Sequence, residues 1–157
     1  MLSGHECTNV PSRVRSCSHL VEQIPPVSSW GRKFATAPLK GGQAYDVFRI
    51  LASKDSTMVA VNCTLSADQP TLHNTKITDT LDEGDFVEFS VSSSQYCLIE
   101  GSNNILVLQY SIGGGADARK GDPAMIIVPA VTQYCSYYTL PTPNTCLLYT
   151  SPSPRDS

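Results

Sequence analysis

The spacing of short apolar runs is the feature that most constrains the fold of this chain. Strand-like segments recur roughly every eight to twelve residues, separated by turn-forming clusters such as Asp82-Glu83-Gly84-Asp85. No stretch carries apolar residues at helical spacing over three turns. The sequence therefore predicts an all-β fold with strands over 33–37, 45–52, 58–63, 86–91, 95–100, 105–112 and 125–128, and with 136–140 as a candidate last strand.

Two of these segments are apolar on both faces. Residues 45–51 and 105–108 show the pattern of central strands that are covered on two sides. In 86–91, apolar and polar residues alternate, which predicts one solvated face. Two packed antiparallel sheets satisfy both observations, so we expect a β-sandwich with little or no helix. Residues 101–104 are expected to form a turn, and the polar segment 68–80 a surface excursion that can hold a short strand.

Size and charge narrow the classes of partner. A chain of 157 residues is enough for one compact domain of ordinary size. Its 11 Lys and Arg and 14 Asp and Glu give a net charge of −3, with no block of like charge that could follow a phosphate backbone. The longest apolar runs are far shorter than the roughly 20 residues that cross a bilayer. We therefore expect neither nucleic-acid binding nor membrane insertion.

Composition divides the chain into three parts. Residues 1–32 are predicted to be an N-terminal lead-in segment that packs on or precedes the domain, 33–140 a C-terminally truncated β-sandwich domain, and 141–157 a disordered tail. Within the tail, 146–156 matches a transposon-based sequencing adapter codon by codon. We interpret this stretch as foreign sequence, so Cys146 is not evidence about disulfides.

Five of the six cysteines remain for disulfides. Strand parity places Cys63 and Cys97 on the inward faces of separate strands, with their sulfur atoms projecting between the layers, and we expect these two cysteines to bond. Cys7 and Cys17 flank a short loop and form the natural second pair. Cys135 is left over, and a buried or partly buried thiol is favoured over an intermolecular bridge.

Asn62-Cys63-Thr64 is a sequon for N-linked glycosylation at the end of a predicted strand. Together with the cysteines and the low charge, it favours an oxidising, extracellular location. No cysteine belongs to a CxxC pair or has a histidine at zinc-ligand spacing, and the acidic run 79–88 does not match an EF-hand loop. No metal and no other cofactor is expected.

No motif indicates catalysis, and no catalytic residue is assigned. His5, His19 and His73 are scattered, and there is no Gly-x-Ser-x-Gly elbow that would tie a serine to one of them. The glycine run 113–115 lacks the Gly-Lys-Ser/Thr ending of a phosphate-binding loop. The sequence therefore favours a protein that is not an enzyme.

Several ordered blocks between residues 4 and 140 carry a family resemblance: His19-Leu20-Val21-Glu22-Gln23-Ile24-Pro25-Pro26, Trp30-Gly31 followed by Phe34, 45–52, Asp55-Ser56-Thr57, Gly84-Asp85-Phe86, Cys97-Leu98-Ile99, 105–110, Gly121-Asp122-Pro123-Ala124-Met125 and Val128-Pro129. Together they resemble the N-terminal module of the IgGFc-binding protein family. The resemblance implies a secreted, largely β module with disulfides, found in mucus-associated and cell-surface multidomain proteins and without catalytic activity. It also implies that a C-terminal portion of the module is missing, and that Cys7, Cys17, Cys63 and Cys97 stand where animal members tend to carry cysteines.

The sequence thus predicts an extracellular, non-catalytic interaction module of a larger secreted or cell-surface protein, in a mucus- or immunoglobulin-associated setting. Its expected partners are a protein or glycan ligand and other domains of the same chain. A structural spacer in a mucus or matrix polymer is the alternative, and it differs in having no saturable partner. A secreted hydrolase is a third, less favoured hypothesis.

Overall fold

The computed structural model of the chain describes residues 2–10, 17–39, 44–64, 75–92, 94–112 and 123–137. These residues form the strands β1 (Leu2–Thr8), β2 (Ser18–Gln23), β3 (Gly31–Thr36), β4 (Tyr45–Ala52), β5 (Thr57–Thr64), β6 (Thr75–Leu81), β7 (Phe86–Ser92), β8 (Tyr96–Tyr110) and β9 (Met125–Ile127). Two 3-10 helices, Val27–Ser29 and Val131–Gln133, have three residues each. No helix in the described part of the chain is long and apolar enough to span a membrane.

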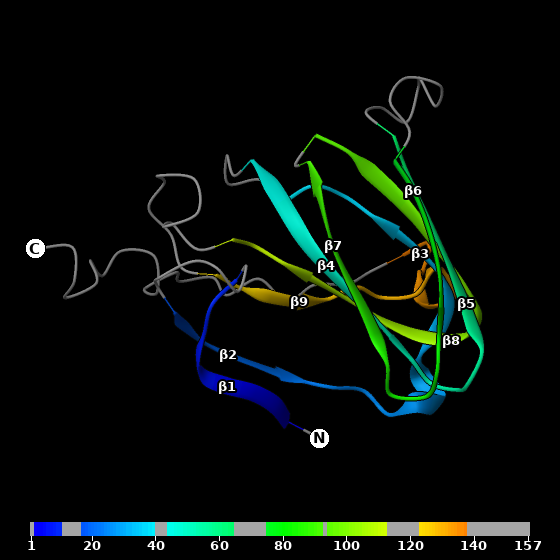
Figure 1. Cartoon of the computed structure of the whole chain (residues 1–157), viewed down its shortest axis with the longest axis horizontal. Helices are drawn as coiled ribbons and strands as arrows, with labels where there is room; N and C mark the ends of the chain where they lie inside the picture. The colour runs from blue at the N-terminus through cyan, green and yellow to red at the C-terminus, as the bar shows by residue number, and fades with distance from the viewer. Residues whose placement is uncertain are drawn as a thin grey trace, which may run out of the picture.

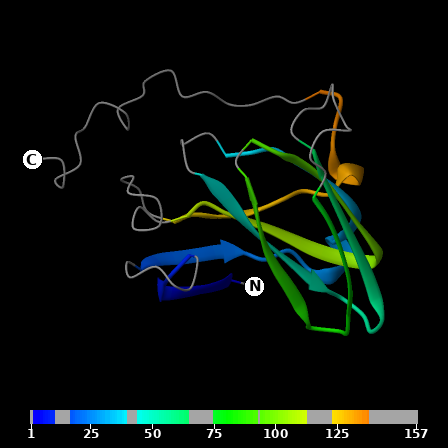
Figure 2. The ribbon, with the colours of Figure 1, turned by 45° about the horizontal axis from the view of Figure 1, so that its top comes forward.

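The long strand β8 belongs to two layers of sheet (Figure 1). Its first half pairs with β5 and β3, and its second half pairs with β4 and β9, in every case antiparallel. Beyond these partners, β6 extends the first layer and β7 the second. The layers pack against each other, as Figure 2 shows from a second direction. The predicted all-β sandwich is confirmed.

The sequence-based prediction of a turn at residues 101–104 is wrong, because β8 runs through them without a break. This is where the strand leaves one layer and enters the other. Gly101 makes the bend possible: a Cβ at this position would lie 2.7 Å from the carbonyl oxygen of Asn103. Residues typical of turns therefore serve here to bend a continuous strand.

The polar side chains of the bend are bound by the first two residues of β5. The hydroxyl of Ser102 accepts a hydrogen bond from the backbone N–H of Met58 at 2.9 Å. The side-chain amide of Asn103 donates to the hydroxyl of Thr57 at 3.2 Å. These contacts supply partners for polar groups that a hairpin would have left to solvent, and they fix the bend against the neighbouring strands.

The main core lies between the two layers. Odd-numbered residues of β5 are buried and alternate with partly or fully exposed ones, and β7 has the predicted solvated face. The rings of Phe48 and Phe89 stack with centroids 5.6 Å apart. The buried residues of this cluster are Phe34, Phe48, Ile50, Ala52, Val59, Val61, Cys63, Leu81, Val91, Cys97, Ile99, Ile105, Val107, Val128 and Ala130.

The second layer is also covered on its outer face, where β1 and β2 form a separate antiparallel pair (Figure 1). Leu20 of β2 is buried there with Leu106 and Leu108 of β8, and Trp30 packs against the same cluster. The second half of β8 is covered on both sides as predicted, whereas Arg49 and Leu51 on the outer face of β4 are only partly buried. Gly31, next to Trp30, is required for close approach, because a Cβ there would collide with the side chain of Ala130.

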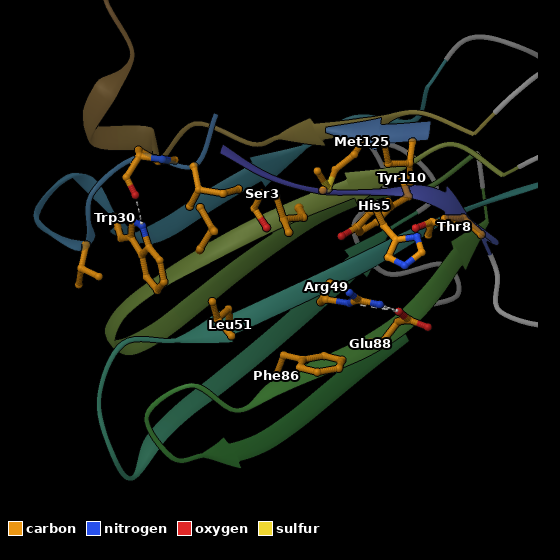
Figure 3. Close-up of a pocket in the computed structure, with 18 of the residues that line it drawn as sticks. Ser3, His5, Thr8, Trp30, Arg49, Leu51, Phe86, Glu88, Tyr110 and Met125 are labelled. Atoms are coloured by element: carbon orange, nitrogen blue, oxygen red, sulfur yellow. Dashed lines mark hydrogen bonds and ion pairs between the residues drawn. The ribbon is translucent and has the colours of Figure 1, made fainter. Parts of the chain in front are cut away.

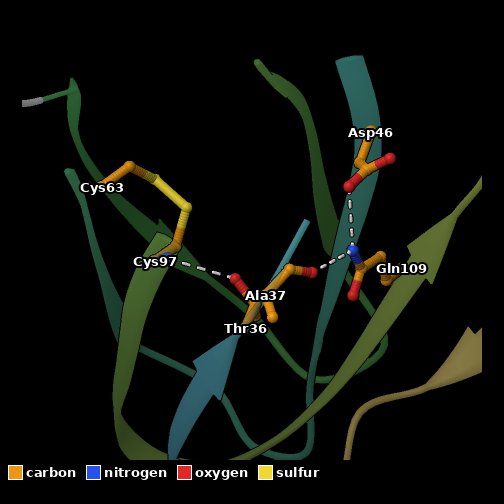
Figure 4. Close-up of a disulfide and its surroundings, with 6 residues drawn as sticks. All are labelled: Thr36, Ala37, Asp46, Cys63, Cys97 and Gln109. Carbon is orange, nitrogen blue, oxygen red and sulfur yellow. Dashed lines mark hydrogen bonds between the residues drawn. A yellow bond between two sulfur atoms is a disulfide. The ribbon is translucent and has the colours of Figure 1, made fainter. Parts of the chain in front are cut away.

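Both disulfides are formed in the structure. Cys63 and Cys97 are directly opposed on β5 and β8, with Cα atoms 4.0 Å apart, and both are buried (Figure 4). The predicted pairing is confirmed: the bond joins neighbouring strands of one layer, and both cysteines belong to the core between the layers. Cys7 and Cys17, with Cα atoms 4.9 Å apart, join β1 to the residue before β2. Cys135, expected to be at least partly buried, is exposed.

A buried polar network ties the end of β3 to the second layer (Figure 4). The side-chain amide of Gln109 donates to the carboxylate of Asp46 at 3.0 Å and to the carbonyl of Ala37 at 2.9 Å. The same carboxylate accepts a hydrogen bond from the backbone N–H of Leu39 at 3.0 Å. Because Asp46 and Gln109 are only 2% and 5% exposed, these bonds replace the water that each group loses on folding.

Some predictions fall outside the described residues. Residues 141–157, the glycine run 113–115 and His73 belong to this group. The excursion at 68–80 is described only from residue 75, where β6 begins. In the candidate last strand 136–140, Ser136 and Tyr137 are described and are not in a strand.

Removal of the buried disulfide should cost more stability than removal of the peripheral one. The sequence separation of 34 residues gives Cys63–Cys97 a contribution of about 4 kcal/mol in the chain-entropy treatment. Urea unfolding of Cys63→Ala/Cys97→Ala, followed by far-ultraviolet circular dichroism, should show a loss of that order. The matched variant Cys7→Ala/Cys17→Ala should lose clearly less, because these cysteines are exposed. Equal losses would contradict the central role of the β5–β8 bond.

Gln109→Leu should destabilise the fold, because it leaves the buried Asp46 carboxylate without its side-chain donor. We expect the free energy of unfolding to fall by about 1–3 kcal/mol in urea titrations. Gln23→Leu, at an exposed position of β2, serves as the matched control and should change stability by less than about 0.5 kcal/mol. A Gln109→Leu protein as stable as the control would show that the network does not contribute.

Candidate functional site

A cleft of about 850 Å³ separates the β1–β2 pair from the outer face of the second layer (Figure 3). Ser3, His5 and Thr8 line it from β1, whereas β4, β7 and β8 supply the opposite wall. The apolar side chains that line it are Val10, Leu20, Ile24, Val27, Trp30, Leu51, Phe86, Leu106, Leu108 and Met125. The cleft thus has one polar wall and one mostly apolar wall.

The register of the sheet places the apolar wall in rows. Leu51 lies directly opposite Phe86 on one side and Leu106 on the other. Because directly opposed residues on antiparallel strands point to the same face, these three side chains form one row across the sheet. Phe86 is 52% exposed at the edge of this row, so it is the large apolar group most available to a partner.

The next row carries charge in the middle of the apolar wall. Arg49 lies between Glu88 and Leu108, and its Nη2 is 2.6 Å from Oε2 of Glu88 (Figure 3). The guanidinium carbon lies 4.6 Å from the centroid of Phe86 and 5.6 Å from that of Tyr110. Arg49 is therefore held by a charge-assisted hydrogen bond and by two cation–π contacts.

Burial raises the pKa of the Tyr110 hydroxyl above its ordinary value of 10.0. The positive charge of Arg49 opposes this shift, and the negative charge of Glu88 adds to it. Tyr110 therefore keeps its proton to higher pH than a solvated tyrosine. Its ring and hydroxyl stay neutral beside the ion pair.

The polar wall does not assemble a nucleophile. Ser3 and His5 both line the cleft from β1, but Nδ1 of His5 accepts a hydrogen bond from the backbone N–H of Cys7 at 3.1 Å. Trp30 closes one end of the cleft, with its indole N–H donating to the carbonyl of Pro25 at 3.1 Å. The cleft thus offers surfaces for contact, and none of its described contacts pairs a serine with a histidine.

Of the residues singled out from the sequence, His5, Trp30 and Glu88 line the cleft, and the disulfides and the sequon lie elsewhere. Neither disulfide lines the cleft. Asn62 is exposed on the outward face of β5, in the first layer. In the acidic run, Asp82 accepts a hydrogen bond from the backbone of Ser56, and Glu88 binds Arg49. Among the described residues, no group of three or more histidine, cysteine or acidic side chains gathers where it could hold a metal ion.

The cleft was not predicted from the sequence, although some of its residues were named there. Arg49 is the one charged residue among the apolar residues 47–52. Phe86 and Glu88 occupy the solvated positions of 86–91. Their outward directions could be read from strand parity. The register that brings Arg49 opposite Glu88 could not be read, because it depends on how two strands 39 residues apart align.

The fold and the cleft define a disulfide-stabilised β-sandwich module with a cleft beneath the β1–β2 pair. The family profile described as IgGFc binding protein matches residues 1–152. A human protein named IgGFc-binding protein is 30% identical over 142 residues, covering 89% of this chain and 2% of that protein. No solved structure matches the chain. The chain belongs to the IgGFc-binding protein family, and it spans about 2% of the length of this curated relative.

Titration of Tyr110 tests the electrostatics of the cleft. Its raised pKa implies stability that is present in full below pH 10 and is lost as the pH rises from 10 through the higher pKa of the folded state. Carbon-13 NMR of the tyrosine rings, assigned with Tyr110→Phe, should show late deprotonation. Glu88→Gln should lower the Tyr110 pKa and Arg49→Gln should raise it. Shifts in the same direction would contradict the arrangement.

Proposed function

We propose that this chain is a non-catalytic, extracellular module that binds a protein partner, and that the cleft under the β1–β2 pair is its binding surface. The two disulfides support an oxidising location. Because the chain spans about 2% of the human relative, we further propose that it acts beside other domains of a longer secreted or cell-surface protein.

One observation carries this proposal: an exposed aromatic ring and an arginine lie together on the apolar wall of an open cleft. Phe86 and Arg49 are in contact at 4.6 Å, and Leu51 extends the apolar surface beside them. Aromatic residues and arginine are the types that contribute most to protein interfaces when they are centrally placed and desolvated by the partner. Glu88 holds the guanidinium in position before any partner arrives.

The choice of partner follows from the relative. The human protein is named for binding the Fc region of immunoglobulin G, so the Fc region is the first partner to test for this chain. A polar wall with Ser3, His5 and Thr8 opposite an apolar wall suits a protein surface of mixed character. The two alternatives, a glycan ligand and a structural spacer without any ligand, predict different outcomes in the same binding assay.

Interferometry with the full chain and immobilised human Fc should show saturable binding. Phe86→Ala and Arg49→Ala should each weaken the equilibrium affinity at least about tenfold, because both remove contacts on the apolar wall of the cleft. Tyr96→Ala is the matched control: Tyr96 is 44% exposed, comparable to Phe86, but lies on the other layer. Its affinity should remain within about twofold of the unsubstituted chain.

Three results would overturn parts of the proposal. If binding is lost with Tyr96→Ala and kept with Phe86→Ala, the cleft is not the site. If Fc binds only while its own glycan is present, the ligand is a carbohydrate. If neither Fc nor Fab fragments nor a panel of mucin-type glycans gives saturable binding, the chain is a structural spacer.

A further inference from the structure

The outer face of the first layer differs from the cleft face, because it has no β1–β2 pair over it. Residues of β5 alternate in direction: Val61 and Cys63 are buried, whereas Asn62 is exposed and Thr64 is partly exposed. Asn62 and Thr64 are the first and third residues of the sole Asn-x-Ser/Thr sequon in the 157 residues. The acceptor nitrogen of the sequon therefore points to solvent, away from the disulfide that Cys63 forms.

Large apolar side chains lie on the β8 side of Asn62, whereas Lys76 lies directly opposite it on β6. Leu98 lies directly opposite Asn62 and is 45% exposed, and Tyr96 lies directly opposite Thr64 and is 44% exposed. Directly opposed side chains have Cβ atoms about 4.5–5.5 Å apart. Asn62 therefore borders an apolar surface, formed by Leu98 and Tyr96, that would otherwise face water.

We propose that Asn62 carries an N-linked glycan whose inner sugars cover this surface. In the transfer step, the amide nitrogen of Asn62 attacks the anomeric carbon of a lipid-linked oligosaccharide diphosphate. A carbon–nitrogen bond forms, the bond between that carbon and the phosphate oxygen breaks, the amide gives up one proton, and the lipid diphosphate leaves. β5 is paired on both edges in the folded chain, so the transfer precedes its entry into the sheet.

The surface beside Asn62 suits a carbohydrate. Two residues back along β5, Ala60 opens onto a hollow of about 870 Å³ whose walls include Met58, Thr78 and Asp79. The ion pair of Lys33 and Glu100, with Nζ and Oε1 2.8 Å apart, lies at the same hollow. Sugars present hydroxyl groups together with apolar C–H faces. The hydroxyl groups can form hydrogen bonds with Lys33, Asp79 and Glu100, and the C–H faces can cover Met58 and Leu98.

The glycan therefore covers the layer that is opposite the cleft, and the cleft is left open for a partner. This inference rests on the proposed function in one respect: the chain must pass through the secretory pathway, where the donor lipid and the transferase are found. It does not require that the partner be the Fc region.

The test uses the full chain secreted from human cells behind a cleavable signal peptide. Intact-mass spectrometry should show an added mass that peptide N-glycosidase removes, with the modified peptide mapping to Asn62. Asn62→Gln should abolish the added mass, and Thr64→Ser, which keeps the sequon, should retain it. A secreted, disulfide-bonded chain without a glycan would overturn the inference while the Fc-binding assay could still succeed.

Covering of the surface is measured separately. Asn62→Gln should bind an apolar fluorescent dye more strongly and should elute from gel filtration at about twice the apparent mass or more, because Leu98 and Tyr96 are then exposed. Asn62→Gln/Leu98→Thr should return to the monomer position. A monomeric Asn62→Gln protein with unchanged dye binding would show that the glycan does not cover this surface. Fc affinity should be the same with and without the glycan.

Discussion

The bend in β8 is the constraint on which the rest of the structure depends. One strand pairs with β3 and β5 before the bend and with β4 and β9 after it, so neither layer can be completed without the other. Strands can pass from one sheet of a sandwich to the other through a bulge or a bend, and β8 makes the crossing in this way. The registered pairing with β5 reaches Gly101 and the pairing with β4 begins at Ile105. Between them, the side chains of Ser102 and Asn103 bond the start of β5, and the carbonyl of Asn104 accepts a hydrogen bond from the backbone of Ser53.

The end of β3 reinforces both halves of β8. The hydroxyl of Thr36 accepts a hydrogen bond from the backbone N–H of Cys97 at 3.3 Å, and the carbonyl of Ala37 accepts one from Gln109 (Figure 4). Consecutive residues thus contact β8 on either side of its bend. The contact at Cys97 lies beside the Cys63–Cys97 disulfide, and the contact at Gln109 lies beside the buried carboxylate of Asp46. A covalent bond and a polar network therefore fix the two halves of β8 relative to β3.

Strand parity could be read from the sequence, and strand partnership could not. The alternation in β5 and β7 predicted which side chains are buried, because residues two apart share a face whatever the neighbouring strand is. Residues 101–104 were misread because glycine, serine and asparagine suit a strand bend as well as a turn. Asp46 lies within the run 45–51 that was read as apolar on both faces, Gln109 directly follows the run 105–108, and only the fold shows that they meet. The pair β1–β2 was missed because 1–32 has little apolar periodicity.

Cys63 and Cys97 are 34 residues apart in the sequence. Their bond closes the segment between them, which contains β6 and β7, into a covalent ring. A protease that cuts the backbone once inside this ring opens it but does not divide the molecule. β5 and β8 remain joined at the registered position, and the fragments on either side of the cut stay at a high local concentration. A nicked chain can therefore persist as one particle until a reductant reaches sulfur atoms that are shielded from solvent.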